Sequence, residues 1–177
     1  MTAAGSASSL WLLACPEDEA WLQAIIDDLA RRRGGPVFRP HLTLMGDLAR
    51  DAADLARTLG AIAAAARPFA AQVAGVETTE AYFRALYAAF PIGPDLGALR
   101  AAAATATGGA AAGFVPHVSL FYGRPTTGTI HEEAEALARS LAGRAVRFDR
   151  VAAVASAQEI PIADWRIAAT AQLGPER

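Results

Sequence analysis

A five-residue pattern occurs twice in this chain and constrains both its fold and its chemistry. Residues 40–44 read Pro-His-Leu-Thr-Leu and residues 116–120 read Pro-His-Val-Ser-Leu, and together they use two of the three histidines in the sequence. Side chains at positions i and i+2 of a β-strand point to the same face, so each copy predicts an imidazole beside a hydroxyl. The predicted pairs are His41 with Thr43 and His117 with Ser119. If the fold brings the two pairs together, one imidazole can accept a proton while the other donates one.

The length and the charge of the chain indicate its domain organisation and the kind of ligand that it can bind. With 177 residues, of which 53% are hydrophobic, the chain is long enough to bury a core, and we expect a single two-lobed domain over residues 1–177. All 16 basic residues are arginine, which reflects a compositional bias, and the net charge is only −2. The arginine run at 31–33 is expected at the solvated end of a helix. The sequence therefore offers no broad basic surface for a polyanion.

Cysteine usage and hydropathy indicate the compartment. Cys15 is the single cysteine, so no disulfide within the chain is possible and a reducing compartment is favoured. No apolar run approaches the roughly 18 residues that a membrane helix needs. We expect a cytoplasmic protein that does not bind membranes.

The predicted secondary structure repeats in the two halves of the chain. In the first half we expect a strand at 10–15, a helix from Pro16, a strand at 37–45, a helix capped by Asp51, and a hairpin of 69–77 with 82–90. The first of these helices is expected to bury Trp21, Ile25 and Leu29. The second is expected to bury Leu55, Leu59, Ile62 and Ala66. In the second half we expect a helix at 94–107, a strand at 115–122, a helix from 129 with a capping box at 129–132, and strands at 146–156 and 165–173. Such a duplication predicts that one motif from each lobe meets in a cleft between two sheets.

The histidines also admit a metal-site interpretation. Zinc prefers three or four ligands, and His131 is the remaining histidine that could join His41 and His117. However, His131 is predicted in the first turn of a helix, on the surface and outside the cleft. We therefore expect no metal and no other cofactor.

The two motifs resemble those of a known family. The segments His41-Leu42-Thr43 and His117-Val118-Ser119, the second followed by Leu-Phe-Tyr-Gly at 120–123, resemble the paired His-x-Thr/Ser motifs of the two-histidine phosphoesterase superfamily. The flanking segments at 9–11, 36–40 and 114–116 are similar to the small cyclic phosphodiesterases of plants and yeast. The resemblance spans about residues 9–165.

The resemblance implies a fold and a reaction. It implies an α+β fold of two lobes, with two antiparallel sheets facing a central cleft and helices outside. It also implies metal-independent hydrolysis of a 2′,3′-cyclic nucleotide to a 2′-phosphate, or opening of ADP-ribose 1″,2″-cyclic phosphate. By analogy His117 is the base that activates water, His41 is the acid that protonates the leaving oxygen, and Thr43 and Ser119 bind the nonbridging oxygens. A nearly symmetric site can also work with the two histidine roles exchanged.

Three further residues are candidates for substrate binding, each with a structural alternative. Trp11 matches the family's early aromatic residue and could stack on a base, or it could be a core tryptophan. Tyr122 matches the tyrosine of the motif, but its odd offset from His117 requires either a bulge or a core position. Arg84 could reach a phosphate, although an exposed arginine on a strand is the preferred interpretation.

Alternative functions remain open. A phosphodiesterase resembling the bacterial 2′-5′ RNA ligase-like enzymes would act on RNA termini, and a binder of nucleotides or RNA ends would lack catalysis. Both motifs are intact, which favours an enzyme of RNA metabolism, and the nearly neutral charge favours a small cyclic nucleotide as its partner. We expect a monomer, although the sequence does not determine the oligomeric state, the base preference or the physiological substrate.

Overall fold

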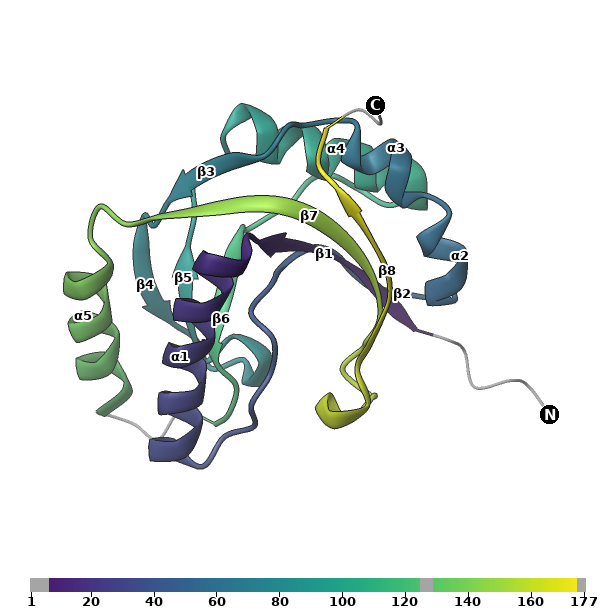
Figure 1. The fold of residues 1–177 in the computed structure, drawn as a ribbon. Helices are drawn as coiled ribbons and strands as arrows, with labels where there is room; N and C mark the ends of the chain where they lie inside the picture. Colours follow the sequence, from purple (N-terminus) through teal and green to yellow (C-terminus); the bar gives the residue numbers. More distant parts are fainter. Residues whose placement is uncertain (1–6, 125–128, 175–177) are drawn as a thin grey trace.

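The fold is a strongly curved antiparallel sheet with helices packed against it (Figure 1). A computed structural model describes residues 7–124 and 129–174 of the chain. The strands are β1 (Ser8–Ala14), β2 (Leu42–Leu48), β3 (Phe69–Gln72), β4 (Gly75–Thr78), β5 (Leu86–Ala89), β6 (His117–Phe121), β7 (Ala145–Ala155) and β8 (Arg166–Gln172). The helices are α1 (Pro16–Arg33), α2 (Ala52–Ala56), α3 (Leu59–Ala63), α4 (Pro94–Thr107) and α5 (Thr129–Leu141), and the 3₁₀ turns are η1 (Tyr82–Arg84) and η2 (Ile162–Asp164).

The strand order explains how the two motifs come together. Hydrogen bonds connect the strands in the order β3-β7-β1-β2-β6-β5-β4, and β8 also pairs with β7. The motif strands β2 and β6 are neighbours at the centre, where they share one residue pair, Leu42 with Val118. The sheets expected as separate are therefore joined into one, with only a narrow connection between the halves. The α+β class is as predicted.

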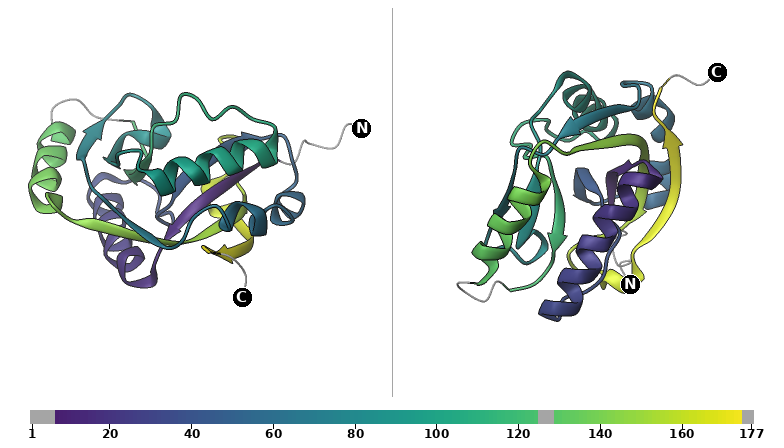
Figure 2. Two further views of the ribbon diagram at one scale, coloured as in Figure 1. Left: turned by 90° about the horizontal axis from the view of Figure 1, so that it is seen from above. Right: turned by 60° about the vertical axis from the view of Figure 1, so that its left-hand side comes forward.

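Helices cover the curved sheet on two sides. Figures 1 and 2 show α1 and α5 on one side and α2, α3 and α4 on another. Arg32 of α1 forms an ion pair with Glu133 of α5 (2.7 Å), which links elements from the two halves of the chain. The largest fully buried side chains include Phe148, Leu10 and Leu44, which belong to one core cluster of strand and helix residues.

Several predicted elements differ in their limits. Residues 37–41 do not form a strand, and β2 begins only at Leu42. Pro40 lacks a backbone N–H and restricts Arg39 before it, which limits pairing there. The run at 69–77 divides into β3, which pairs with β7, and β4, which forms a hairpin with β5. The predicted hairpin of 69–77 with 82–90 is therefore correct only in its second part.

Two helices show similar differences in detail. Asp51 caps its helix as predicted, because its carboxylate accepts a hydrogen bond from the Ala53 N–H (2.7 Å). That helix is nevertheless divided into α2 and α3. On α1, Leu22 and Ile26 are buried while Trp21 and Ile25 are only partly buried. Trp21 lies at the edge of the buried face, where its indole N–H donates to Asp18 (2.8 Å).

Among the residues that the structure describes, no helix combines the length and the apolar character required to cross a membrane.

Candidate active site

A cavity of about 520 Å³ lies where the two motif strands meet. All seven residues singled out from the sequence line it: Trp11, His41, Thr43, Arg84, His117, Ser119 and Tyr122. The other lining residues come from β1, the end of β2, η1, the segment after β7, and Trp165. The fold therefore brings together side chains that are far apart in the sequence.

The two histidines are held in the same way. The His41 ring nitrogen Nδ1 is 2.7 Å from the backbone oxygen of Arg39, and His117 Nδ1 is 2.8 Å from that of Val115. A carbonyl oxygen can only accept, so each Nδ1 carries the proton that is donated. In the neutral imidazoles Nε2 is then the unprotonated nitrogen, with a lone pair available to accept a proton. In both copies the acceptor lies two residues before the histidine, and the proline stands between them.

Burial determines the charge state of the pair. The pKa of His41 is lowered to about 4, because the ring is buried and because the charge of His117 and that of Arg39 disfavour its protonation. The pKa of His117 is also lowered, mainly by burial and further by Arg84. The effect of His117 on His41 means that their titrations are coupled.

Both motif strands contain a bulge at the leucine that follows the hydroxyl residue. In β2, Thr43 pairs with Trp11 and Met45 with Leu10, so Leu44 has no partner. In β6, Ser119 pairs with Tyr87 and Phe121 with Leu86, so Leu120 has no partner. An extra residue shifts the alternation of side chains by one position. The two halves therefore share a backbone irregularity as well as a sequence motif.

The second bulge explains the position of Tyr122. With Leu120 as an extra residue, the odd offset from His117 no longer turns Tyr122 to the opposite face. Its ring lines the cavity, is only 3% exposed and stacks on Phe38 with ring centroids 3.7 Å apart. Both alternatives considered for Tyr122 thus apply, because β6 bulges and the side chain is also packed. Burial raises the pKa of its hydroxyl.

The hydroxyls of the motifs differ. Ser119 is buried, and its Oγ donates a hydrogen bond to the backbone oxygen of Phe83 in η1 (2.9 Å). Thr43 is half-buried and lines the cavity. The Ser119 hydroxyl must therefore rotate away from Phe83 before it can donate to a bound oxygen. In the described part of the chain, Thr43 has no such bond to the Phe83 oxygen, so its hydroxyl needs no such rotation.

Aromatic rings support both imidazoles. Trp11 is buried and stacks on His41, with ring centroids 3.6 Å apart and an interplanar angle of 9°. Tyr87 contacts His117 edge to face at 5.2 Å and donates its hydroxyl hydrogen bond to Glu77 (2.5 Å). Because Trp11 pairs with Thr43 and Tyr87 pairs with Ser119, these two rings occupy equivalent positions on β1 and β5. Tyr87 was not predicted from the sequence, since its equivalence to Trp11 depends on strand register.

Arg84 is not the exposed strand arginine that was expected from the sequence. It lies in η1, is only partly exposed and lines the cavity. Its guanidinium carbon is 5.4 Å from the centre of the Tyr87 ring, and its Nε is buried without a hydrogen-bond partner among the described residues. A cation in this position favours an anionic ligand.

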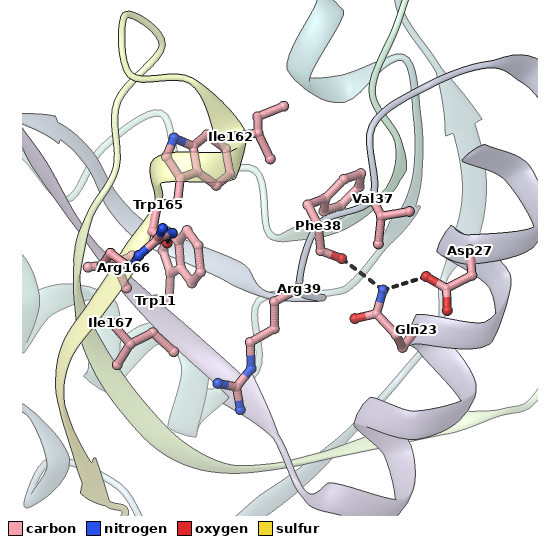
Figure 3. Close-up of a pocket in the computed structure, with 11 residues that line it drawn as sticks. Trp11, Gln23, Asp27, Val37, Phe38, Arg39, Ile162, Trp165, Arg166 and Ile167 are labelled. Atoms are coloured by element: carbon pink, nitrogen blue, oxygen red, sulfur yellow. Dashed lines mark hydrogen bonds between the residues drawn. The ribbon is translucent and has the colours of Figure 1, made fainter. Parts of the chain in front are cut away.

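A second cavity of about 670 Å³ adjoins the first and shares Trp11 and Trp165 with it (Figure 3). Gln23 and Asp27 of α1 lie on one side, and the two tryptophans lie on the other. The Gln23 amide donates to Asp27 (2.9 Å) and to the backbone oxygen of Phe38 (3.0 Å). No sequence pattern indicated this space, because its walls come from elements far apart in the chain, namely β1, α1, the segment before β2, β7, η2 and β8.

The third histidine does not join the pair. His131 is exposed on α5, where its ring is 3.1 Å from the Thr78 hydroxyl, and it does not line the cavity. Within residues 7–124 and 129–174, no three side chains of the types His, Cys, Asp and Glu are grouped so that they could hold a metal ion.

Comparison with known proteins identifies the family of the chain. Residues 16–159 match the family model of the 2′-5′ RNA ligase superfamily. The chain belongs to this superfamily. The two-histidine resemblance is thereby confirmed at the superfamily level, while the match does not specify the plant and yeast cyclic phosphodiesterase type.

Solved structures share the fold at low sequence identity. A Thermus thermophilus protein, TT0787, aligns with a TM-score of 0.61 and 19% identity over 97% of this chain and all of the other. Escherichia coli LigT in complex with 3′-AMP aligns with a TM-score of 0.54 and 15% identity over 94% of this chain and 98% of the other. No curated protein sequence gives a significant match.

Proposed function

We propose that this protein is a metal-independent phosphodiesterase that hydrolyses 2′,3′-cyclic nucleotides to 2′-phosphates, with His41 and His117 as its acid–base pair. The observation that carries the proposal is the repeated hydrogen bond from each Nδ1 to the carbonyl two residues earlier. Because Nδ1 is occupied by this bond, Nε2 of each ring is available for proton transfer, and both rings lie in one cavity. Membership of the 2′-5′ RNA ligase superfamily supports a phosphoesterase role.

The proposed reaction is an in-line displacement at phosphorus. Water attacks on one side while the ribose oxygen leaves on the opposite side, so a base is needed on one side and an acid on the other. Thr43 and Ser119 donate hydrogen bonds to the nonbridging oxygens, and Arg84 contributes positive charge where the phosphate binds. Each group acts through a side chain already present in the cavity.

The two histidine roles in this proposal are those implied by the resemblance. His117 is the base that activates water, and His41 is the acid that protonates the leaving oxygen. Burial lowers the pKa of both rings and their titrations are coupled, so the productive form of the pair is the one that holds a single proton.

The duplication also forms part of the proposal. The strand order β7-β1-β2-β6-β5-β4 is unchanged when β1, β2 and β7 are exchanged with β5, β6 and β4. We infer that two related halves, each contributing one motif, built the site.

A second candidate function is hydrolysis at an RNA terminus. The adjoining cavity of about 670 Å³ favours it, because it offers space for a further nucleotide beside Trp11 and Trp165 (Figure 3). The small net charge favours the mononucleotide.

The experiment is an assay of purified protein against the four 2′,3′-cyclic nucleotides, ADP-ribose 1″,2″-cyclic phosphate and a short RNA ending in a 2′,3′-cyclic phosphate. Phosphorus NMR identifies the product. The proposal expects a 2′-phosphate from the cyclic mononucleotides, with kcat/KM at least equal to that of the RNA. A strong preference for the RNA would favour the second candidate, and no turnover of any of them would refute the proposal.

A further inference from the structure

The end of β2 turns a carboxylate toward the cavity. Gly46 and Asp47 together oppose the single residue Ser9 of β1, so β2 contains a second bulge at this point. Asp47 has φ 51° and is the only non-glycine residue with positive φ in the described part of the chain. Aspartate tolerates this backbone region better than most residues, and bulges beside active sites redirect side chains. Asp47 consequently lines the cavity, which regular alternation would not ensure.

The segment after β7 completes a polar group around Asp47. Ser156 and Gln158 line the same cavity, and Gln158 Nε2 donates to the Asp47 carboxylate (3.2 Å). Ser156 is only 2% exposed, and its hydroxyl has no hydrogen-bond partner among the described residues. The Ser9 hydroxyl donates to the Ser156 backbone oxygen (3.2 Å), which fixes this segment against β1. A buried hydroxyl without a hydrogen-bond partner destabilises the fold, and a polar ligand at this end of the cavity would supply the missing hydrogen bond.

The position suits the nucleoside part of a substrate whose phosphate lies between the histidines. Asp47 is four residues beyond Thr43, at most about 13 Å along the strand. Tyr82, which is 43% exposed, and Phe83 also line the cavity and present aromatic surface on which a base can stack.

The available groups are mainly acceptors. A carboxylate has two oxygens with about four lone pairs, so Asp47 retains acceptor capacity beside its bond to Gln158. The Gln158 carbonyl oxygen is a further acceptor. The matching ligand has adjacent N–H donors, and guanine supplies two on its Watson–Crick edge, at N1 and N2. Adenine, cytosine and uracil have a donor at one position only on that edge, next to acceptors that a carboxylate repels.

We propose that Asp47, Ser156 and Gln158 form a nucleobase subsite that selects guanine. The proposal rests on the proposed function, because it places a nucleotide phosphate at the two histidines. It adds a base preference that the paired motifs themselves do not encode.

The experiment is isothermal titration calorimetry with guanosine 2′-monophosphate and uridine 2′-monophosphate. The wild-type protein is expected to bind the guanosine nucleotide about five-fold more tightly or better, the lower end of what one bidentate base contact contributes. Asp47→Asn should bring the affinity ratio close to one, because one acceptor oxygen becomes a donor. Asparagine also tolerates positive φ, so the bulge should be kept. Gln158→Ala should lower the ratio of guanosine to uridine nucleotide affinity at least two-fold. Because Gln158 is exposed, this variant provides the test if Asp47→Asn does not fold.

Glu135→Gln is the matched control. Glu135 is exposed on α5 and outside the cavity, so this variant removes the same charge and should keep the wild-type ratio. Equal wild-type affinities for the two nucleotides, no binding of either, or an unchanged ratio in Asp47→Asn would overturn the subsite. Absence of hydrolysis with the binding preference preserved would count against the proposed function alone.

Discussion

At the residue scale, the site depends on hydrogen bonds that the sequence suggests only indirectly. The repeated histidine and hydroxyl residues were predictable from their spacing, and all four line one cavity. The bond from each Nδ1 to a carbonyl could not be predicted, because it depends on the backbone path through the preceding proline. Tyr87 was missed for a different reason. It corresponds to Trp11 in position, and each of the two aromatic residues follows a leucine, but so short a pattern does not reveal the equivalence without the strand register.

Removal of either imidazole should reduce turnover strongly. We expect His41→Ala and His117→Ala each to lower kcat on a 2′,3′-cyclic nucleotide by about 100-fold or more, since an acid or base contributes roughly 10²–10⁴-fold. Steady-state kinetics measures the loss, and circular dichroism checks that the variants are folded. His131→Ala is the control, because His131 lies outside the cavity and should keep wild-type activity. Near-normal activity of either site variant would refute the paired mechanism.

The roles of the two histidines can be separated with a substrate that needs no acid. A p-nitrophenolate leaving group departs without protonation, so loss of the acid matters less than loss of the base. We expect His41→Ala to lose at least about ten-fold less activity on bis(p-nitrophenyl) phosphate than on a cyclic nucleotide, while His117→Ala loses similar factors on both. The ratio of kcat/KM to wild type on each substrate gives the comparison. The reverse pattern would exchange the roles, with His117 as the acid and His41 as the base.

At the element scale, the order of helices and strands was predictable, but their irregularities were not. Hydrophobic periodicity located α1, the flanking proline and glycines located α4, and the repeated motif located β2 and β6. Periodicity did not indicate that 69–77 divides between two partners, because the alanine-rich strands carry little pattern. The bulges at Leu44 and Leu120 were also hidden, although the odd offset of Tyr122 pointed to one of them. Bulges are set by pairing between strands, which a single sequence does not show.

A glycine allows the segment after α1 to approach the end of β6. A Cβ at Gly35 would lie 2.8 Å from the backbone oxygen of Tyr122 and would also overlap the Phe121 ring. We expect Gly35→Ala to lower the free energy of unfolding by about 1–3 kcal/mol, as overpacking does. Gly75→Ala, where a Cβ meets nothing within 4 Å, is the control and should change it by about 0.5 kcal/mol or less. Urea unfolding measures both. Equal free energies of unfolding for the two variants would show that Gly35 is not tightly packed against the end of β6.

At the scale of the whole molecule, strand pairing joins segments that are far apart in the chain. β7 pairs with β1 near the start of the chain, while β4 pairs with the next strand, β5. In the resulting order β2 and β6 are side by side at the centre of the sheet. The repeated order of elements suggested a shared cleft, but these pairings could not be predicted from the sequence, because the residues of a strand do not determine its partner.

Catalysis by side chains alone predicts insensitivity to chelators. We expect activity on a cyclic nucleotide to change less than about two-fold after dialysis against EDTA, because the proposed acid, base and oxyanion contacts need no metal ion. Activity before dialysis, after dialysis and after addition of zinc or manganese is compared. Loss with EDTA and recovery with metal would require a metal-dependent mechanism.

The pH dependence of turnover reports on the protonation of the two histidines during catalysis. Only the form with one neutral and one protonated histidine is productive, so kcat and kcat/KM should both be bell-shaped. Since burial lowers the pKa of both rings, with His41 at about 4, the falling limb of kcat/KM should lie below the ordinary histidine value of about 6.5. A bound phosphate favours the imidazolium, so the falling limb of kcat should lie at higher pH. Both profiles are measured on one 2′,3′-cyclic nucleotide. A rate that rises to a plateau without any fall at high pH, with chemistry shown to be rate-limiting, would contradict the opposed acid and base.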